Sequence, residues 1–466
     1  MNRHLQTRLP FSVKLGYGTA EFSSTLTWTL VSVVFLFFLT DVVGLAPVFA
    51  GFVMMLGGLW DAVTDPTMGI LSDRLNHRWG RRRPFLLAVA LPFGLITWLL
   101  LTDFGFGPVA TKVYFCLAIM AYYTAATMLD VPYTSLGAEM TQDYDERTSL
   151  NGYRALFSQI AAIVAAAFPW TLVAFCIDIT GDKKAGWSLM AGIFGITTIL
   201  PILITWHTSR GRELNIEKPV IRLKDIFEGP LKNRTFLYTM GIYICGGVSL
   251  SSAGAVMIYF MKYYMSFNGL QESLAFLFLF ACSIIWIPVI HLLSARFGKR
   301  ESFIFFMGIW AVVQAAGVMM IKPGMDLAFY TMMFIASGGV MSISMTIWAM
   351  IPDAIEVDEF KTGERREGLY FGVIAFSRKI AVAMASLLIG LVLSAVGYVE
   401  NQPQTETALM GIRILYAEGV GFFVFLSVIM AYLLPMNRRR HRALREAIRA
   451  QKAGMAYDED ALRKIL

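Results

Sequence analysis

Two aspartates, Asp61 and Asp65, interrupt an apolar stretch in the segment Trp60-Asp61-Ala62-Val63-Thr64-Asp65-Pro66. Residues four apart share one face of a helix, so both carboxylates point toward one place, with the Thr64 hydroxyl one position away. Oxygen ligands of this kind suit a hard cation such as Na⁺. Adjacent carboxylates also share protons, so the same pair suits H⁺. The chemistry predicted here is the reversible binding of a cation.

A third aspartate, Asp130, follows Thr127 by three residues and precedes Pro132. Both side chains therefore lie on one face of a helix whose backbone the proline loosens. Arg378 and Lys379 lie well inside another apolar stretch and require carboxylates as partners. A structural ion-pair cluster between the halves of the molecule and a cation site are both open interpretations of these charges.

A stripe of polar and aromatic residues recurs every three or four positions near the start of the chain, at Tyr17, Glu21, Thr25 and Trp28. Such a stripe indicates either helix packing or one wall of a polar cavity. Glu21 favours the cavity, because a carboxylate inside an apolar helix needs water or a cationic partner. Two orientations are open for the Arg154 side chain. It extends to the membrane interface, or it turns inward and binds sugar hydroxyls or a carboxylate.

The elements that position these residues are predicted to be membrane helices. The chain has 466 residues, of which 56% are hydrophobic and only 16% charged, whereas a soluble domain has about 25% charged residues. The charges separate apolar stretches that are each long enough to cross a bilayer, which takes about 20 residues. The first apolar stretch exceeds the core of a cleavable signal sequence, so we expect it to remain as a helix.

Twelve spans are expected, with boundaries near 14–40, 46–71, 84–104, 108–137, 152–176, 186–208, 234–263, 270–293, 302–321, 326–352, 367–396 and 409–435. Lys and Arg concentrate in alternate connections, such as 74–83, 210–234 and 296–300. This bias predicts that both termini are cytoplasmic and assigns the net charge of +7 to membrane topology rather than to nucleic acid. We expect the protein in the plasma (inner) membrane, as a monomer.

An internal repeat supports a two-part architecture. The segment from Arg78 to Arg82 recurs, shifted by 218 residues, as the segment from Arg296 to Arg300. Many transporters are built from related halves. The expected organisation is an N-terminal six-helix half at 1–208, a cytoplasmic linker at 209–233, a C-terminal six-helix half at 234–435 and a cytoplasmic tail at 436–466.

Several function classes are disfavoured. The four cysteines and five histidines are scattered, without the spacing of a zinc site or a redox pair. No pairing of a nucleophile with a base is visible, so we do not expect an enzyme or a cofactor. A transporter-like membrane sensor remains an alternative from a different class; a sensor would normally carry a soluble domain, whereas we expect only a short helical tail after Arg438.

The segments 60–66, 69–84, 143–148 and 362–368 together resemble those of the glycoside-pentoside-hexuronide:cation symporters of the major facilitator superfamily. The resemblance extends to about residue 435. It implies an all-α membrane protein with the major facilitator fold, in which twelve helices form two pseudo-symmetric halves. It also implies symport of a sugar, glycoside or hexuronide with Na⁺ or H⁺ by alternating access.

Site residues are carried over where the motifs match. The resemblance implies a cation site at Asp61, Thr64, Asp65, Thr127 and Asp130, in which Asp61 and Asp65 would ligate Na⁺. It implies that Lys379 adjoins that site and that Arg154 lines the sugar pocket. The expected substrate-binding set is Thr25, Trp28, Asp130, Arg154, Arg378 and Lys379. For the cytoplasmic gate we expect Arg82, with Asp145 and Glu364 as acidic residues.

One departure from the family concerns the substrate. The best-known member holds galactoside hydroxyls with an aspartate where this chain has Thr25, and a hydroxyl cannot replace a carboxylate that accepts two charge-assisted bonds. Another sugar class is therefore expected, and an anionic substrate would meet Arg154, Lys379 and Arg378. A lysophospholipid-like or other amphiphilic solute is the alternative. The expected partners are the solute, the coupling cation and the lipid bilayer.

Overall fold

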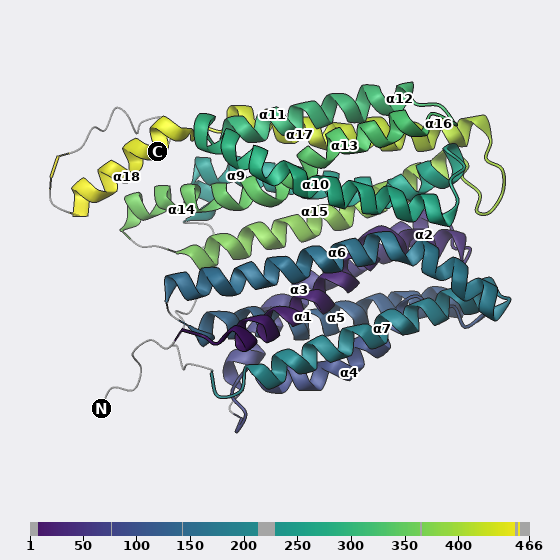
Figure 1. Ribbon diagram of the computed structural model, residues 1–466, viewed down its shortest axis with the longest axis horizontal. Coiled ribbons are helices and arrows are strands. Elements are labelled where there is room, and N and C mark those ends of the chain that lie inside the picture. Colours follow the sequence, from purple (N-terminus) through teal and green to yellow (C-terminus); the bar gives the residue numbers. More distant parts are fainter. Residues whose placement is uncertain are drawn as a thin grey trace. The chain divides into compact units, whose positions relative to one another are not determined.

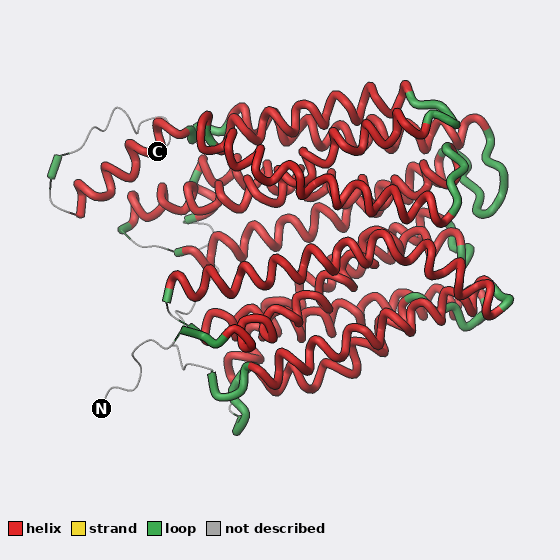
Figure 2. The backbone as a smooth tube through the Cα atoms, in the orientation of Figure 1, coloured by secondary structure: helices red, strands yellow, loops and turns green. Residues whose placement is uncertain are grey.

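The computed structural model describes residues 8–75, 77–141, 143–212, 229–363, 366–452 and 455–456. Within these ranges the regular structure is helical and no strand occurs (Figures 1 and 2). The described residues include 12 helices that are long and apolar enough to cross a membrane, which confirms the predicted number. Most of the predicted linker, at 213–228, and Glu364 of the predicted gate lie outside the described residues.

The chain divides into two compact units. The first contains residues 1–218, 267–277 and 386–403, and the second contains residues 219–266, 278–385 and 404–466. Six membrane spans belong wholly to the first unit: α1 (Phe11–Thr29), which continues through a π-helical turn (Leu30–Phe35) into α2 (Leu36–Asp41), then α3 (Pro47–Arg74), α4 (Arg83–Leu100), α5 (Pro108–Met140), α6 (Tyr144–Thr180) and α7 (Lys183–Thr208).

Local chemistry sets the helix ends of the first unit. The Asp143 carboxylate caps α6 by accepting a hydrogen bond from the Glu146 amide, and Asp182 caps α7 in the same way. Gly181, at a φ of 69°, ends α6 in a left-handed conformation that suits glycine. Helices α4 and α7 lie side by side (Figure 1) and approach closely, because a Cβ on Gly94 would lie only 2.5 Å from the Gly195 carbonyl oxygen.

A buried carboxylate closes the end of the first span. Asp41 is 1% exposed, and its Oδ2 accepts hydrogen bonds from the hydroxyls of Thr40 (2.8 Å) and Tyr398 (2.5 Å). Its backbone carbonyl accepts from Lys183 Nζ and from Asn401 Nδ2, each at 2.7 Å. Lys183 is the first residue of α7, and Tyr398 and Asn401 lie within residues 386–403, so the cluster joins three separate segments of the first unit.

The second unit contains α9 (Arg234–Tyr259), α11 (Lys299–Val312), α12 (Val318–Met320), α13 (Asp326–Ser342), α14 (Trp348–Thr362), α16 (Glu406–Ile414), α17 (Val420–Leu433) and α18 (Arg438–Lys452). Helices α10 (Gly269–Phe297) and α15 (Glu367–Ala395) contribute residues to both units. Asn233 caps α9 through the Phe236 amide, and Gly363, at a φ of 75°, ends α14. Part of the core is a cluster of Ile290, Phe306 and Met341.

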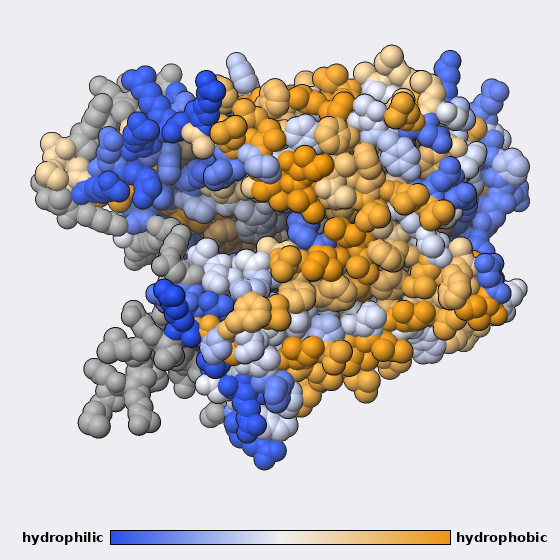
Figure 3. All heavy atoms as spheres, viewed as in Figure 1, coloured by the Kyte–Doolittle hydropathy of each residue, from blue (hydrophilic) through white to orange (hydrophobic). Residues whose placement is uncertain are grey.

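The surface of each unit is apolar along its helices. Figure 3 shows hydrophobic residues along the flanks of the helices and hydrophilic residues toward the helix ends. Large side chains such as Leu91, Val109 and Leu327 are more than half exposed, which would be costly in water over so large an area. In a bilayer these side chains face lipid tails, so the fold is that of an integral membrane protein.

Candidate functional site

Four side-chain oxygens meet between α3 and α5 in the first unit. The Thr127 hydroxyl oxygen lies 3.1 Å from Oδ1 of Asp61 and 3.1 Å from Oδ1 of Asp65. The Thr64 hydroxyl lies 3.0 Å from the same Thr127 oxygen. A hydroxyl carries one hydrogen and donates it to one acceptor at a time, so the remaining lone pairs around Thr127 form an oxygen-rich site.

The site is buried in helix packing. Asp61 is 7% exposed and Thr127 is 2% exposed. Gly57, one turn before Asp61, allows the close approach of the two helices: a Cβ there would lie 2.5 Å from Ile119 and 2.6 Å from Tyr123, both on α5. The sequence thus positions the first carboxylate by removing a side chain on the same face of α3.

Two prolines lie directly beyond the polar residues. Pro66 follows Asp65 within α3, and Pro132 lies inside α5 shortly after Asp130. A proline in a helix removes the N–H that would bond to the carbonyl four residues earlier. Here those carbonyls belong to Ala62 and Met128, which are neighbours in sequence of Asp61 and Thr127. Both helices thus lack one backbone donor beside the candidate cation site.

Asp130 is half-buried and lies three residues after Thr127 on the same face of α5. Within the described ranges, no three His, Cys, Asp or Glu side chains come together in a way that could hold a metal ion. The structure therefore brings Asp61, Thr64, Asp65 and Thr127 together, without a compact cluster of three carboxylates. These four residues together present two carboxylates and two hydroxyls.

Beside this site, two pairs of polar side chains join α1 and α6, Glu21 with Arg154 and Thr25 with Ser158. Arg154 donates from Nε to Glu21 Oε2 at 2.7 Å, and its Nη2 lies 2.7 Å from the same oxygen. Of the two orientations expected for Arg154, the structure shows the inward one. One turn further along both helices, the hydroxyls of Thr25 and Ser158 lie 3.0 Å apart.

Aromatic rings complete this face. The Arg154 guanidinium lies 5.0 Å from the centroid of the Tyr133 ring, at cation–π distance. Tyr133 and Tyr17 each donate a hydrogen bond to the other's backbone carbonyl, at 3.0 and 3.1 Å. Trp28, the last residue of the predicted stripe, is 39% exposed. The stripe of α1 thus belongs to a polar contact region between α1, α5 and α6, in which Tyr17 and Tyr133 are fully buried.

Ser158 was not among the site residues predicted from the sequence. A signal existed, because Ser158 lies four residues after Arg154, just as Thr25 lies four residues after Glu21.

The two predicted substrate cations of the other unit lie on α15. The guanidinium of Arg378 lies 5.6 Å from the ring centroid of Tyr243 on α9. Gly247 makes room for it, since a Cβ there would lie 2.9 Å from Arg378 Cδ. Lys379 follows on the same helix and is half-buried. The assignment of both residues to the substrate stays a prediction.

The predicted gate residue Arg82 is fully buried among three partners in the first unit. It donates to the Ser72 hydroxyl at 2.6 Å and to Glu139 Oε1 at 3.0 and 3.1 Å, and it forms an ion pair with Asp73. Neither Asp73 nor Glu139 was predicted from the sequence as a partner of Arg82. The side chain of Asp145 and the whole of Glu364 lie outside the described residues, so their role in a gate stays a prediction.

Known proteins are similar to this chain over nearly its whole length. A family described as MFS/sugar transport protein matches residues 16–438. An uncharacterized symporter, YnaJ, of Bacillus subtilis is 30% identical over 96% of each chain, and an isoprimeverose transporter of Lactiplantibacillus pentosus is 25% identical over 97% of this chain and 94% of its own.

Among solved structures, a bacterial homolog of the human lysosomal transporter Spinster superposes with a TM-score of 0.66 at 14% identity, covering 95% of this chain and 98% of that chain. The family match and this neighbour together support the major facilitator fold. The chain therefore belongs to the MFS/sugar transport family, whose members are membrane transporters rather than enzymes.

Proposed function

We propose that the protein is a cation-coupled symporter of a sugar or glycoside. The observation that carries this proposal is the position of Thr127 Oγ1, 3.1 Å from a carboxylate oxygen of both Asp61 and Asp65. Two carboxylates beside two hydroxyls offer Na⁺ the oxygen ligands that hard cations prefer. The same pair can instead bind a proton, because carboxylate oxygens also accept protons. Asp130, on the same face of α5, is proposed to belong to this site.

The coupling follows from charge. With the cation absent, Asp61 and Asp65 place negative charge in a buried site, which is costly. Binding of the cation neutralises that charge and stabilises the conformation that accepts the sugar. Linkage then requires that sugar raises the affinity for the cation by the same factor. Alternating access of the two six-helix halves is the transport mode we propose, with both termini in the cytoplasm and the protein in the inner membrane.

We propose that the substrate-binding surface includes the two polar side-chain pairs between α1 and α6, Glu21–Arg154 and Thr25–Ser158. Glu21 lies 2.7 Å from Arg154, so the positive charge of that arginine is compensated within the protein. A compensated pair offers sugar hydroxyls an acceptor and several donors without favouring a charged solute. A neutral sugar or glycoside therefore fits this surface better than an anionic one. The relative named as an isoprimeverose transporter supports a sugar substrate.

The test is uptake of labelled sugars by the purified chain in proteoliposomes. An inward Na⁺ gradient and an inward H⁺ gradient are imposed separately, with a gradient-free control. We expect one of the two gradients to drive accumulation above the external concentration. Ligand-induced thermal shifts across glycosides, uronides and lysolipids, in Na⁺ and in choline, select the substrate. A shift with lysolipids alone, or uptake that no cation gradient accelerates, would contradict the proposal.

A further inference from the structure

Two arginines at equivalent positions of the internal repeat, Arg82 and Arg300, have different surroundings. The repeat shift of 218 residues pairs Arg82 with Arg300. Arg82 is held by Ser72, Asp73 and Glu139. The same shift places Ile290, His291 and Val357 at the three corresponding positions, so neither carboxylate recurs at its shifted position. Arg300 therefore has the same positive charge as Arg82, but it has no carboxylates at the positions that correspond to Asp73 and Glu139.

The contacts of Arg300 agree with this difference. Its Nη2 donates to the Tyr432 carbonyl at 2.8 Å. Its Nε is buried and has no hydrogen-bond partner among the described residues. A buried N–H of a charged group without an acceptor is costly, and such groups normally bind water, an ion or a ligand.

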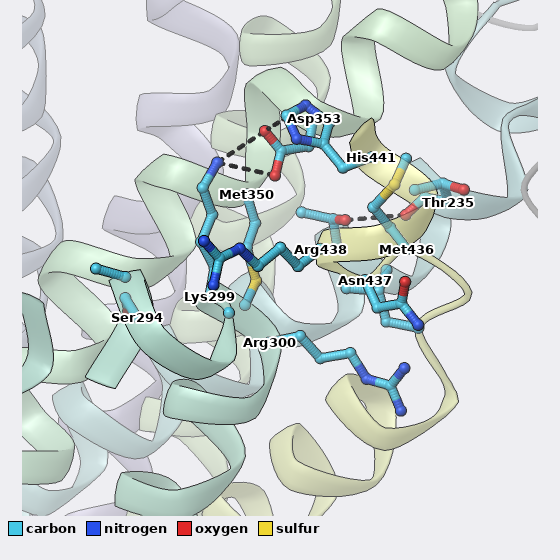
Figure 4. A pocket seen from close by; sticks show the side chains of 14 residues that line it. Thr235, Ser294, Lys299, Arg300, Met350, Asp353, Met436, Asn437, Arg438 and His441 are labelled. Carbon is cyan, nitrogen blue, oxygen red and sulfur yellow. Dashed lines mark hydrogen bonds and ion pairs between the residues drawn. The ribbon is translucent and has the colours of Figure 1, made fainter. Parts of the chain in front are cut away.

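A cavity of about 310 Å³ lies beside Arg300 in the second unit (Figure 4). It is enclosed by the start of α9, the α10–α11 turn, α14 and the start of α18. Its charged walls are Lys299, Arg300, Asp353, Arg438 and His441. The volume lies at the lower edge of the range typical of small-molecule sites, about 300 to 1,000 Å³.

Among the described residues that line the cavity, Asp353 is the one carboxylate, and its charge is compensated. Lys299 Nζ donates to both oxygens of Asp353, at 2.8 and 2.9 Å. His441 Nε2 lies 3.4 Å from Asp353 and 2.9 Å from Glu356, and Figure 4 shows Lys299 and His441 converging on Asp353. Two cations therefore remain at the cavity wall, Arg300 and Arg438.

Arg438 also lines the cavity, but unlike the half-buried Arg300 it is exposed. Its Nη1 donates to the Arg296 carbonyl at 2.8 Å, and within the described residues it forms no ion pair with a carboxylate. The two guanidinium groups come from different elements, the start of α11 and the start of α18. Each has donors to spare, because a guanidinium carries five N–H groups and each uses one in these contacts.

We propose that this cavity is a binding site for a phosphate-type oxyanion, separate from the transport site. The anion would occupy the role in the second half that Asp73 and Glu139 fill for Arg82 in the first. A phosphate group presents several acceptor oxygens and suits two arginine forks. The ligand is either a small soluble phosphate ester or the headgroup of an anionic lipid, since both carry this chemistry. Because Arg438 and His441 belong to α18, the bound anion would also hold the tail helix against α11 and α14.

Calorimetric titration tests the site. The full chain is purified in a maltoside detergent, which contains no phosphate, and is titrated with inorganic phosphate, glucose 6-phosphate and dioctanoyl phosphatidylglycerol. We expect saturable binding of at least one probe. The variants Arg300→Gln and Arg438→Gln should each weaken it about tenfold or more, because a hydrogen bond to a charged group contributes at least that factor.

The matched control is Arg445→Gln, on the same tail helix but outside the cavity lining, and it should bind as the unchanged chain does. Binding of phosphate and glucose 6-phosphate identifies a soluble ligand, whereas binding of the lipid alone identifies a headgroup. Thermal unfolding of each variant shows that it is folded. The proposal is overturned if no probe binds, or if Arg445→Gln loses as much affinity as the cavity variants.

Discussion

The hydroxyl of Thr127 on α5 lies 3.1 Å from Oδ1 of Asp61 on α3, inside a packed helix pair. This contact connects α3 and α5 through the buried Asp61 carboxylate. The second carboxylate, on Asp65, lies at the same distance from the same hydroxyl. A threonine is therefore the geometric centre of the candidate cation site, and the two aspartates are its charged walls.

Removal of either charge should uncouple transport. Asp61→Asn and Asp65→Asn each leave an amide of similar size but halve the negative charge that attracts the cation. We expect both variants to lose accumulation driven by a cation gradient, while exchange of labelled for unlabelled sugar continues. Asp178→Asn, an exposed position on α6, is the control and should accumulate sugar normally. Unchanged uphill uptake by both site variants would exclude this assignment.

The Thr127 hydroxyl can be tested by an isosteric change. Thr127→Val keeps the shape and removes a buried hydrogen bond to a charged group, which contributes about 1.5 to 3 kcal/mol. We therefore expect the cation concentration for half-maximal uptake to rise about tenfold or more. Thr127→Ser keeps the hydroxyl and should remain close to the unchanged chain. Equal behaviour of the valine and serine variants would show that the hydroxyl is not a ligand.

Gly57 should act on the same site through packing. A Cβ at this position would overlap Ile119 and Tyr123, whereas a Cβ at Gly69 on the same helix meets no atom within 4 Å. Overpacking of this kind costs about 1 to 3 kcal/mol. We expect Gly57→Ala to lower the unfolding temperature and the cation affinity together, and Gly69→Ala to change neither. A normal cation affinity in Gly57→Ala would show that α3 can shift without disturbing Asp61.

The sequence predicts some features of this molecule well because they depend on local chemistry. The twelve spans follow from the length of the apolar stretches, and the meeting of Asp61 and Asp65 follows from helical periodicity. Those features need no knowledge of which helices are neighbours.

Other features depend on helix neighbours and were not predictable. The choice of Arg154 between the interface and Glu21 depends on the approach of α6 to α1. The partners of Arg82 include Glu139, which lies 57 residues away on another helix. The buried contact of Asp41 with Tyr398 joins residues 357 positions apart. Side-chain type predicts that each charge has a partner, but only the packing of the helices selects it.

Glu21 should control the charge of the accepted substrate. In Glu21→Gln the positive charge of Arg154 loses its 2.7 Å partner and becomes available to an anionic solute. We expect the ratio of uronide uptake to neutral glycoside uptake to rise about tenfold, equivalent to ~1.4 kcal/mol. Competition between a labelled glycoside and an unlabelled uronide measures this ratio. A ratio that does not change would place the Glu21–Arg154 pair outside the substrate surface.

Arg82 should be a stability residue in the first unit whatever its part in gating. Arg82 and Glu139 are both almost fully buried, and Arg82→Gln would leave the Glu139 carboxylate without its main counter-charge. Breaking a buried ion pair from one side costs about 3 to 5 kcal/mol. We expect a large fall in the unfolding temperature in detergent, and a partial recovery in the double variant Arg82→Gln with Glu139→Gln, because the unpaired Glu139 charge is then removed.

Arg78→Gln, on the same loop but exposed, is the matched control and should unfold as the unchanged chain does. If the double variant were as unstable as Arg82→Gln alone, the hydrogen bonds of Arg82 to Ser72 and Asp73, rather than the charge of Glu139, would account for the loss.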